Sequence, residues 1–111
     1  MMNVALEEKN VYEDFEPRSD TLFFKVGSHG LISFHGRNYN IKKKLSAEER
    51  NRLLSDSNFY RVASDCYVNV GKISHIEEDG LHFGNCTKSV SCSKRVQHYV
   101  MQMMQGSPRV G

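Results

Sequence analysis

The chain has 111 residues, of which 39% are hydrophobic and 25% are charged. This composition is ordinary for a globular protein, and the length suits a single domain that buries roughly two-thirds of its unfolded surface. No apolar run approaches the roughly 20 residues that span a bilayer, and the first 20 residues lack the apolar core of a signal peptide, so we expect a cytoplasmic protein that does not enter a membrane.

The formal net charge of +2 is unevenly distributed. Residues 1–20 contain six acidic and two basic residues (−4), and the rest of the chain contains 7 acidic and 13 basic residues (+6). No acidic residue follows Gly80. Although a single surface lysine is usually only solvated, this one-sided distribution favours a polyanionic partner.

Three cysteines, Cys66, Cys86 and Cys92, occur without a CxxC motif, and the five histidines are scattered. We therefore expect reduced thiols that act as small apolar side chains, with no metal site and no cofactor. A redox role for Cys86 and Cys92 remains an alternative if two strand ends bring them together. The sequence has no nucleophile–base–acid set and no phosphate-binding loop, so we do not expect an enzyme.

In chain order, residues 1–20 are predicted to form an acidic arm or linker that Pro17 closes. Residues 21–26, 31–35 and 39–43 are rich in β-forming residues and are separated by glycine-containing turns. They predict a three-stranded meander.

Residues 45–54 change to a helical period, and Ser46 and Glu49 have the spacing of a capping box. We predict a short helix here. Further strands are predicted over residues 58–62, 73–77, 81–83 and 88–92, with the Asp79-Gly80 pair as a hairpin signal.

The last predicted element is a helix that Ser93 caps and that a polar tail follows at residues 106–111. Its apolar residues recur at i, i+3, i+4, i+7 and i+8, which predicts a stripe lying on the sheet. The members of this stripe are Val96, Tyr99, Val100, Met103 and Met104.

Several of these residues stand in the order and spacing of one known pattern. The LytTR DNA-binding domain has the pattern F-x-R-x-H-[RK]-S-x-x-V-N-x-x-x-I, then a hairpin, then V-S-[RK] and a helix. Residues 21–105 resemble it through Phe59, Arg61, Val68, Asn69, Ile73, Ser93 and Lys94. The resemblance implies a mainly β, elongated fold of small antiparallel sheets with a short middle helix and a C-terminal helix.

The resemblance also implies a function, namely sequence-specific binding of double-stranded DNA by a bacterial transcription regulator. LytTR domains are output domains of two-component response regulators and insert loops into successive DNA grooves. On this basis we expect base contacts from His29, Ser64 and Arg95. Phosphate contacts are expected from Ser93, Lys94, Lys88, Arg61 and Arg37.

One departure from the family pattern affects the middle loop. Ala63-Ser64-Asp65 replaces the usual His-[RK]-Ser, so a basic residue is missing and an acid is present. A carboxylate near phosphates is repelled unless a donor compensates, so Asp65 either weakens this contact or accepts from a cytosine amino group or a partner.

The lysine run at residues 42–44 and Asn69 each have a structural explanation that does not involve DNA. If the Lys42-Lys43-Lys44 run is extended, Lys42 and Lys44 face one way and Lys43 the other, and the run could equally protect a strand edge from pairing. The Asn69 amide is expected to satisfy the backbone of the turn that follows it.

The expected partners are paired direct repeats in DNA, a second copy side by side on them, and a receiver domain or other partner protein. The alternative is a small β-rich protein-interaction module with weak or lost DNA binding. A single-strand binder would need exposed aromatic residues beside basic ones on strands, a pattern that the sequence lacks.

Overall fold

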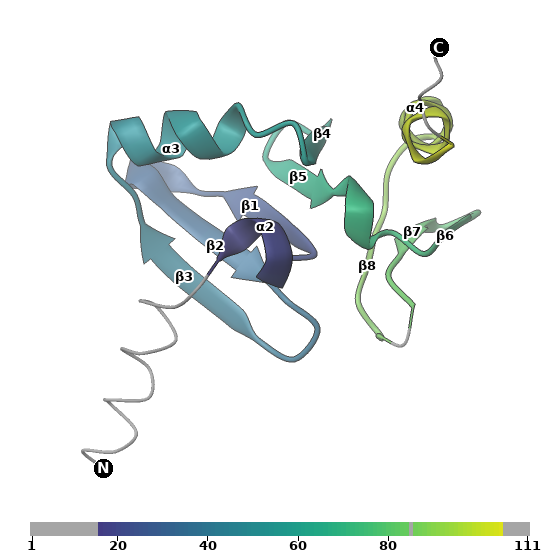
Figure 1. The fold of residues 1–111 in the computed structure, drawn as a ribbon, viewed down its shortest axis with the longest axis horizontal. Helices are drawn as coiled ribbons and strands as arrows, with labels where there is room; N and C mark the ends of the chain where they lie inside the picture. Colours follow the sequence, from purple (N-terminus) through teal and green to yellow (C-terminus); the bar gives the residue numbers. More distant parts are fainter. Residues whose placement is uncertain (1–15, 85, 106–111) are drawn as a thin grey trace.

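The computed structural model describes residues 16–84 and 86–105 (Figure 1). Most of the predicted acidic arm and all of the polar tail lie outside this range. The described elements are α2 (Pro17–Asp20), β1 (Phe23–Val26), the 3-10 helix η1 (Ser28–Gly30), β2 (Leu31–His35), β3 (Asn40–Lys44), α3 (Ala47–Leu54), β4 (Phe59–Ala63), β5 (Cys66–Asn69), the 3-10 helix η2 (Val70–Lys72), β6 (His75–Glu77), β7 (Gly80–His82), β8 (Ser89–Val90) and α4 (Lys94–Met104).

The larger sheet has five antiparallel strands in the order β3-β2-β1-β5-β4. The predicted meander of β1, β2 and β3 is confirmed. Strand β5 was not predicted as a separate strand, yet it lies in the interior of the sheet and pairs with β1, placing Lys25 opposite Cys66. Ser64 and Asp65 are therefore the tight turn of a β4–β5 hairpin, with a bulge between Arg61 and Ala63.

The smaller sheet contains three antiparallel strands in the order β6-β7-β8. The Asp79-Gly80 signal correctly predicted the turn between β6 and β7. Strand β8 is shorter than the predicted strand over 88–92 because Ser91 and Cys92 lead directly into α4.

Alternation along the strands of the larger sheet gives it two buried faces. Phe24 and Phe34 are almost fully buried on the face that packs with Leu53 of α3. Phe23 and Val68 face the other way, toward the smaller sheet and α4. Figure 1 accordingly places α3 and α4 on different parts of a molecule whose extents are 49 × 32 × 26 Å. The expected elongated, mainly β architecture is confirmed.

Both long helices begin where the sequence predicts. Ser46 Oγ accepts from the Glu49 backbone N–H at 3.1 Å, and the Glu49 carboxylate accepts from the Ser46 N–H at 2.9 Å, completing the capping box. Ser93 Oγ likewise accepts from the Val96 N–H at 3.2 Å.

The predicted apolar stripe of α4 is only partly correct. Val100 is fully buried, but Tyr99 is 46% exposed, and Met103 and Met104 are also exposed. Gln97 is buried in their place, and its amide nitrogen donates to the Cys92 carbonyl. The cause is the way the helix packs: α4 contacts η2 and buries Val100 in the core, whereas Tyr99 and Met103 border a shallow pocket beside Tyr60 of β4.

The predicted role of Asn69 also needs correction. Its amide nitrogen donates to the Thr21 carbonyl at 2.9 Å, in the buried segment that precedes β1. The side chain therefore ties β5 to the distant start of the sheet, a pairing that local sequence cannot reveal. In the part of the chain that the structure covers, no helix combines the length and apolar character needed to cross a bilayer.

Candidate nucleic-acid interface

The turn after β1 presents His29 as an exposed tip. His29 has φ 58° and ψ 33°, a left-handed conformation that is uncommon outside glycine. Gly30 follows with φ 77°, and a Cβ there would lie 2.9 Å from the Leu45 carbonyl oxygen. The Leu45 N–H donates to the Gly30 carbonyl at 2.9 Å, so the link into α3 holds the turn in a defined position.

The β4–β5 turn lies beside this tip. Its residues Ala63, Ser64 and Asp65 are all exposed. The Val26 N–H, at the end of β1, donates to the Asp65 carbonyl at 2.8 Å. Since Val26 immediately precedes the His29 turn, both turns occupy the same end of the larger sheet.

Arg61 braces the β4–β5 turn from within its own hairpin. Its Nε donates to the Ala63 carbonyl at 3.2 Å, and its Nη2 donates to the Ser64 carbonyl at 3.0 Å. The side chain is nevertheless exposed, so other guanidinium N–H groups still face solvent. Arg61 thus positions Ser64 and can also contact an anion.

The start of α4 forms the third exposed segment. Ser93, Lys94 and Arg95 are exposed, and the first turn contains no acidic residue. Lys94 Nζ lies 4.0 Å from a Glu78 carboxylate oxygen, but the side chains are 71% and 97% exposed, so this pair contributes little.

A shared core connects this helix start to the β4–β5 hairpin. Cys92, directly before Ser93, packs against the buried cluster that contains Cys66, the first residue of β5. Burial raises the pKa of the Cys66 thiol to about 11 and also raises that of Cys92, so both remain protonated near neutral pH. All three cysteines are free thiols, and these two act as small apolar side chains.

Two residues that were predicted to contact phosphate, Lys88 and Arg37, form hydrogen bonds within the protein. Lys88 Nζ donates to the Gly36 carbonyl, to the Tyr39 carbonyl at 2.9 Å and to Asn40 Oδ1 at 2.9 Å. Arg37 Nη1 donates to the Phe83 carbonyl. These bonds connect the β2–β3 turn to the smaller sheet, at the opposite strand ends from the His29 turn.

Sequence reasoning missed one basic feature of the larger sheet. The strand register places Lys25 opposite Ser33, and Ser33 opposite Lys42, so the two lysines share one face. Lys42 and Lys44 are exposed on that face and Lys43 is half-buried on the other, as predicted, and β3 is an edge strand. Alternation along β1 indicates from the sequence which face of the strand Lys25 occupies. Only the strand order shows that Lys25 and Lys42 lie on the same face of the sheet.

Comparison with known proteins supports the fold. No protein-family model matches the sequence, and no curated protein matches it. A solved structure, described as the LytTr DNA-binding domain of a response regulator from Bacillus cereus, superposes with a TM-score of 0.55 at 21% sequence identity. The match covers 81% of this chain and 84% of the other. This chain therefore has the LytTR-type fold, mainly β, with two antiparallel sheets, a short middle helix and a C-terminal helix.

Proposed function

We propose that this chain binds double-stranded DNA with sequence specificity, as the output domain of a cytoplasmic bacterial response regulator that controls transcription. The observation that carries the proposal is the exposure of the His29 turn, the Ser64-Asp65 turn and the Ser93–Arg95 helix start within a LytTR-type fold. The solved structure with that fold is itself described as a DNA-binding domain.

The start of α4 has the chemistry of a phosphate site. Lys94 and Arg95 lie at the positive end of the helix dipole, which costs about 0.3–1 kcal/mol for each cation at low salt. A phosphate bound by Ser93 and the exposed backbone N–H groups would reverse that penalty, because helix N-termini bind anions. Lys94 then contacts the phosphate backbone of the DNA, and Arg95 contacts the edge of a guanine base.

The other two segments supply the remaining base contacts. His29 is small enough and exposed enough to enter a groove, and Ser64 can donate to or accept from a base edge. Asp65 repels phosphates, so its turn faces base edges or a cytosine amino group. Arg61 contributes a phosphate contact beside this turn.

Lys88 and Arg37 are the weaker candidates among the proposed phosphate contacts. Each would exchange hydrogen bonds within the protein for bonds to DNA. The exposed lysine row of Lys25 and Lys42 offers a sequence-independent attraction to DNA without that exchange.

In the proposed complex, two copies lie side by side on paired direct repeats, and a receiver domain or partner protein controls them.

The test is selection of bound sequences from random duplexes, followed by fluorescence anisotropy over a range of salt concentrations. Arg95→Ala should reduce discrimination between the selected duplex and a mismatched one by about 1–3 kcal/mol. Lys94→Ala should lower the slope of log K against log salt by about one. Arg52→Ala, an exposed arginine on α3 that pairs with Glu48, is the matched control and should change neither quantity.

A protein-interaction module is the second candidate, and the end of α4 favours it. Among the described residues, Tyr99, Met101, Met103 and Met104 leave an exposed apolar surface there. If the chain bound no duplex in the selection, even at low salt, this candidate would replace DNA binding.

A further inference from the structure

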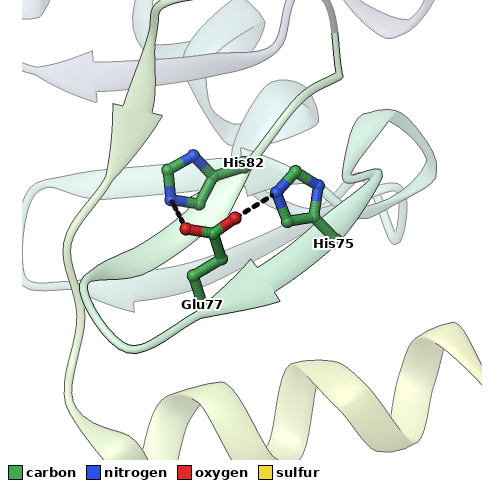
Figure 2. A group of neighbouring side chains, drawn as sticks. All are labelled: His75, Glu77 and His82. Carbon is green, nitrogen blue, oxygen red and sulfur yellow. Dashed lines mark hydrogen bonds and ion pairs between the residues drawn. The ribbon is translucent and has the colours of Figure 1, made fainter.

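The β6–β7 hairpin brings together two histidines and a glutamate (Figure 2). His75 and His82 lie directly opposite each other across the strand pair, with ring centroids 5.0 Å apart and planes 12° apart. The Glu77 carboxylate lies between them: Oε2 is 2.7 Å from His75 Nε2, and Oε1 is 3.8 Å from His82 Nε2. The candidate ligand atoms of the three side chains all lie within 4.8 Å of one another.

The hairpin fixes this arrangement through its two faces. Ile76 and Leu81 alternate with the cluster residues and pack into the core, where Leu81 is fully buried. His75, Glu77 and His82 consequently share the outer face of the hairpin. The packing of Ile76 and Leu81 anchors the inner face of the hairpin, and the pairing of β6 with β7 sets the spacing of the three side chains on the outer face.

We propose that His75, Glu77 and His82 bind a divalent transition-metal ion, with Zn²⁺ as the ion that suits them best. Imidazole nitrogen and carboxylate oxygen are both Zn²⁺ ligands, and three protein ligands are sufficient for a site that keeps one open position. Asp79 lies outside this set of three, and its Oδ1 is the hydrogen-bond partner of His82 Nε2 at 2.9 Å.

The carboxylates of the cluster give it the negative charge that a bound cation requires. Glu77 and Asp79 place two carboxylates around the same imidazole nitrogen of His82. His75 Nε2 lies 2.7 Å from Glu77 and His82 Nε2 lies 2.9 Å from Asp79, and a metal ion bound to the two deprotonated imidazoles would take the place of these N–H groups. The sequence spacing H-x-E-x-x-x-x-H gave no familiar zinc motif, because the strand register, not helical spacing, brings the ligands together.

The test is isothermal titration calorimetry of the reduced full chain with ZnCl₂, and with MgCl₂ as the comparison ion. We expect one Zn²⁺ per chain and no Mg²⁺ binding, since Mg²⁺ requires an octahedral shell of oxygen ligands. His75→Ala and His82→Ala should each weaken Zn²⁺ binding more than about tenfold. Removing a residue that only orients a metal ligand already lowers metal affinity by about 10–100-fold.

Controls separate this site from other ligands of zinc. His98→Ala removes an exposed histidine from α4, and Cys86→Ser removes a partly buried thiol; both variants should bind Zn²⁺ as the parent chain does. Circular dichroism of His75→Ala, an exposed position, checks that the variant folds.

Nuclear magnetic resonance adds a second readout that is independent of affinity. Substoichiometric Zn²⁺ should shift the imidazole signals of His75 and His82 and leave those of His29 and His98 unchanged. Equal Zn²⁺ affinity in the parent and the His75→Ala/His82→Ala double variant would overturn the proposal, as would the absence of saturable binding. Neither result depends on whether the chain binds DNA.

Discussion

His35 and His82 differ in the direction in which the fold moves their pKa. Burial lowers the pKa of His35, and Lys88 and Lys25 act in the same direction, while its hydrogen bond with Asn40 opposes them. The hydrogen bond with Asp79 is the main cause that raises the pKa of His82. In a metal-free titration followed by nuclear magnetic resonance, His35 should therefore titrate below about 6.5 and His82 above it. The reverse order would contradict these environments.

This difference has a consequence for stability. Because the folded pKa of His35 is lowered, its contribution is complete above its unfolded pKa of about 6.5 and is lost as the pH falls through the folded value. His82 acts with the opposite sign, since its contribution is complete below about 6.5 and is lost as the pH rises through its raised pKa. Urea unfolding at pH 7 and pH 5 should show a smaller loss on acidification for His35→Gln than for the parent chain.

The residues that could be predicted from sequence are those with local partners. Ser46, Glu49 and Ser93 cap helices through atoms only three residues away, and local spacing is sufficient to find them. Lys25 and Asn69 could not be assigned, because their neighbours come from strand pairings that no local pattern specifies.

At the scale of elements, the capping box of α3 should contribute measurably to stability. Ser46→Ala removes the acceptor of the Glu49 N–H and should cost about 1 kcal/mol of unfolding free energy. Ser57→Ala, at an exposed position in the turn before β4, is the matched control. Chemical denaturation measures both, and equal effects of the two substitutions would show that the cap is dispensable.

The β6–β7 hairpin depends on glycine at position 80. Gly80 has φ 147°, and a Cβ there would lie 2.1 Å from the Val90 carbonyl oxygen of β8. Gly80→Ala should therefore displace β8 and destabilise the protein by more than the 1–3 kcal/mol typical of backbone strain alone. Gly71→Ala is the control, because its nearest contact would be 3.7 Å, from Asn69 Oδ1. A Gly80→Ala melting temperature equal to that of Gly71→Ala would contradict the close packing.

Element types were easier to predict than element positions. Alternating and helical periods found every described strand except β5, whose turn residues Ser64-Asp65 suggested a break in the chain. The helical period found α4 but not the face it buries, because Tyr99 and Met103 satisfy the pattern yet stay exposed beside Tyr60 of β4. Which face of α4 is buried depends on how the helix packs against the rest of the molecule, including Leu81 and Val90 of the smaller sheet.

At the scale of the whole molecule, the five-stranded sheet lies between two cores, and the candidate interface depends on that division. The α3 core holds the His29 turn through the Leu45–Gly30 hydrogen bond. The second core holds the start of α4 beside β5. Proper spacing of the proposed DNA contacts therefore requires that the two sheets keep their relative arrangement.

Lys88 provides the test of that arrangement, because it connects the smaller sheet to the β2–β3 turn. Lys88→Ala removes a cation from two backbone carbonyls and the Asn40 side chain, and hydrogen bonds to a charged group are worth about 1.5–3 kcal/mol. Lys44→Ala, an exposed lysine on β3, is the control and should have little effect on unfolding.

The same pair of variants separates two roles for Lys88. If it connects the sheets, Lys88→Ala should lower the free energy of unfolding and weaken DNA binding indirectly, leaving the salt slope nearly unchanged. If it contacts phosphate, stability should hold and the slope should fall by about one. The hydrogen bonds favour the first outcome, because a half-buried ammonium group with three acceptors within the protein gains little by exchanging them for a phosphate.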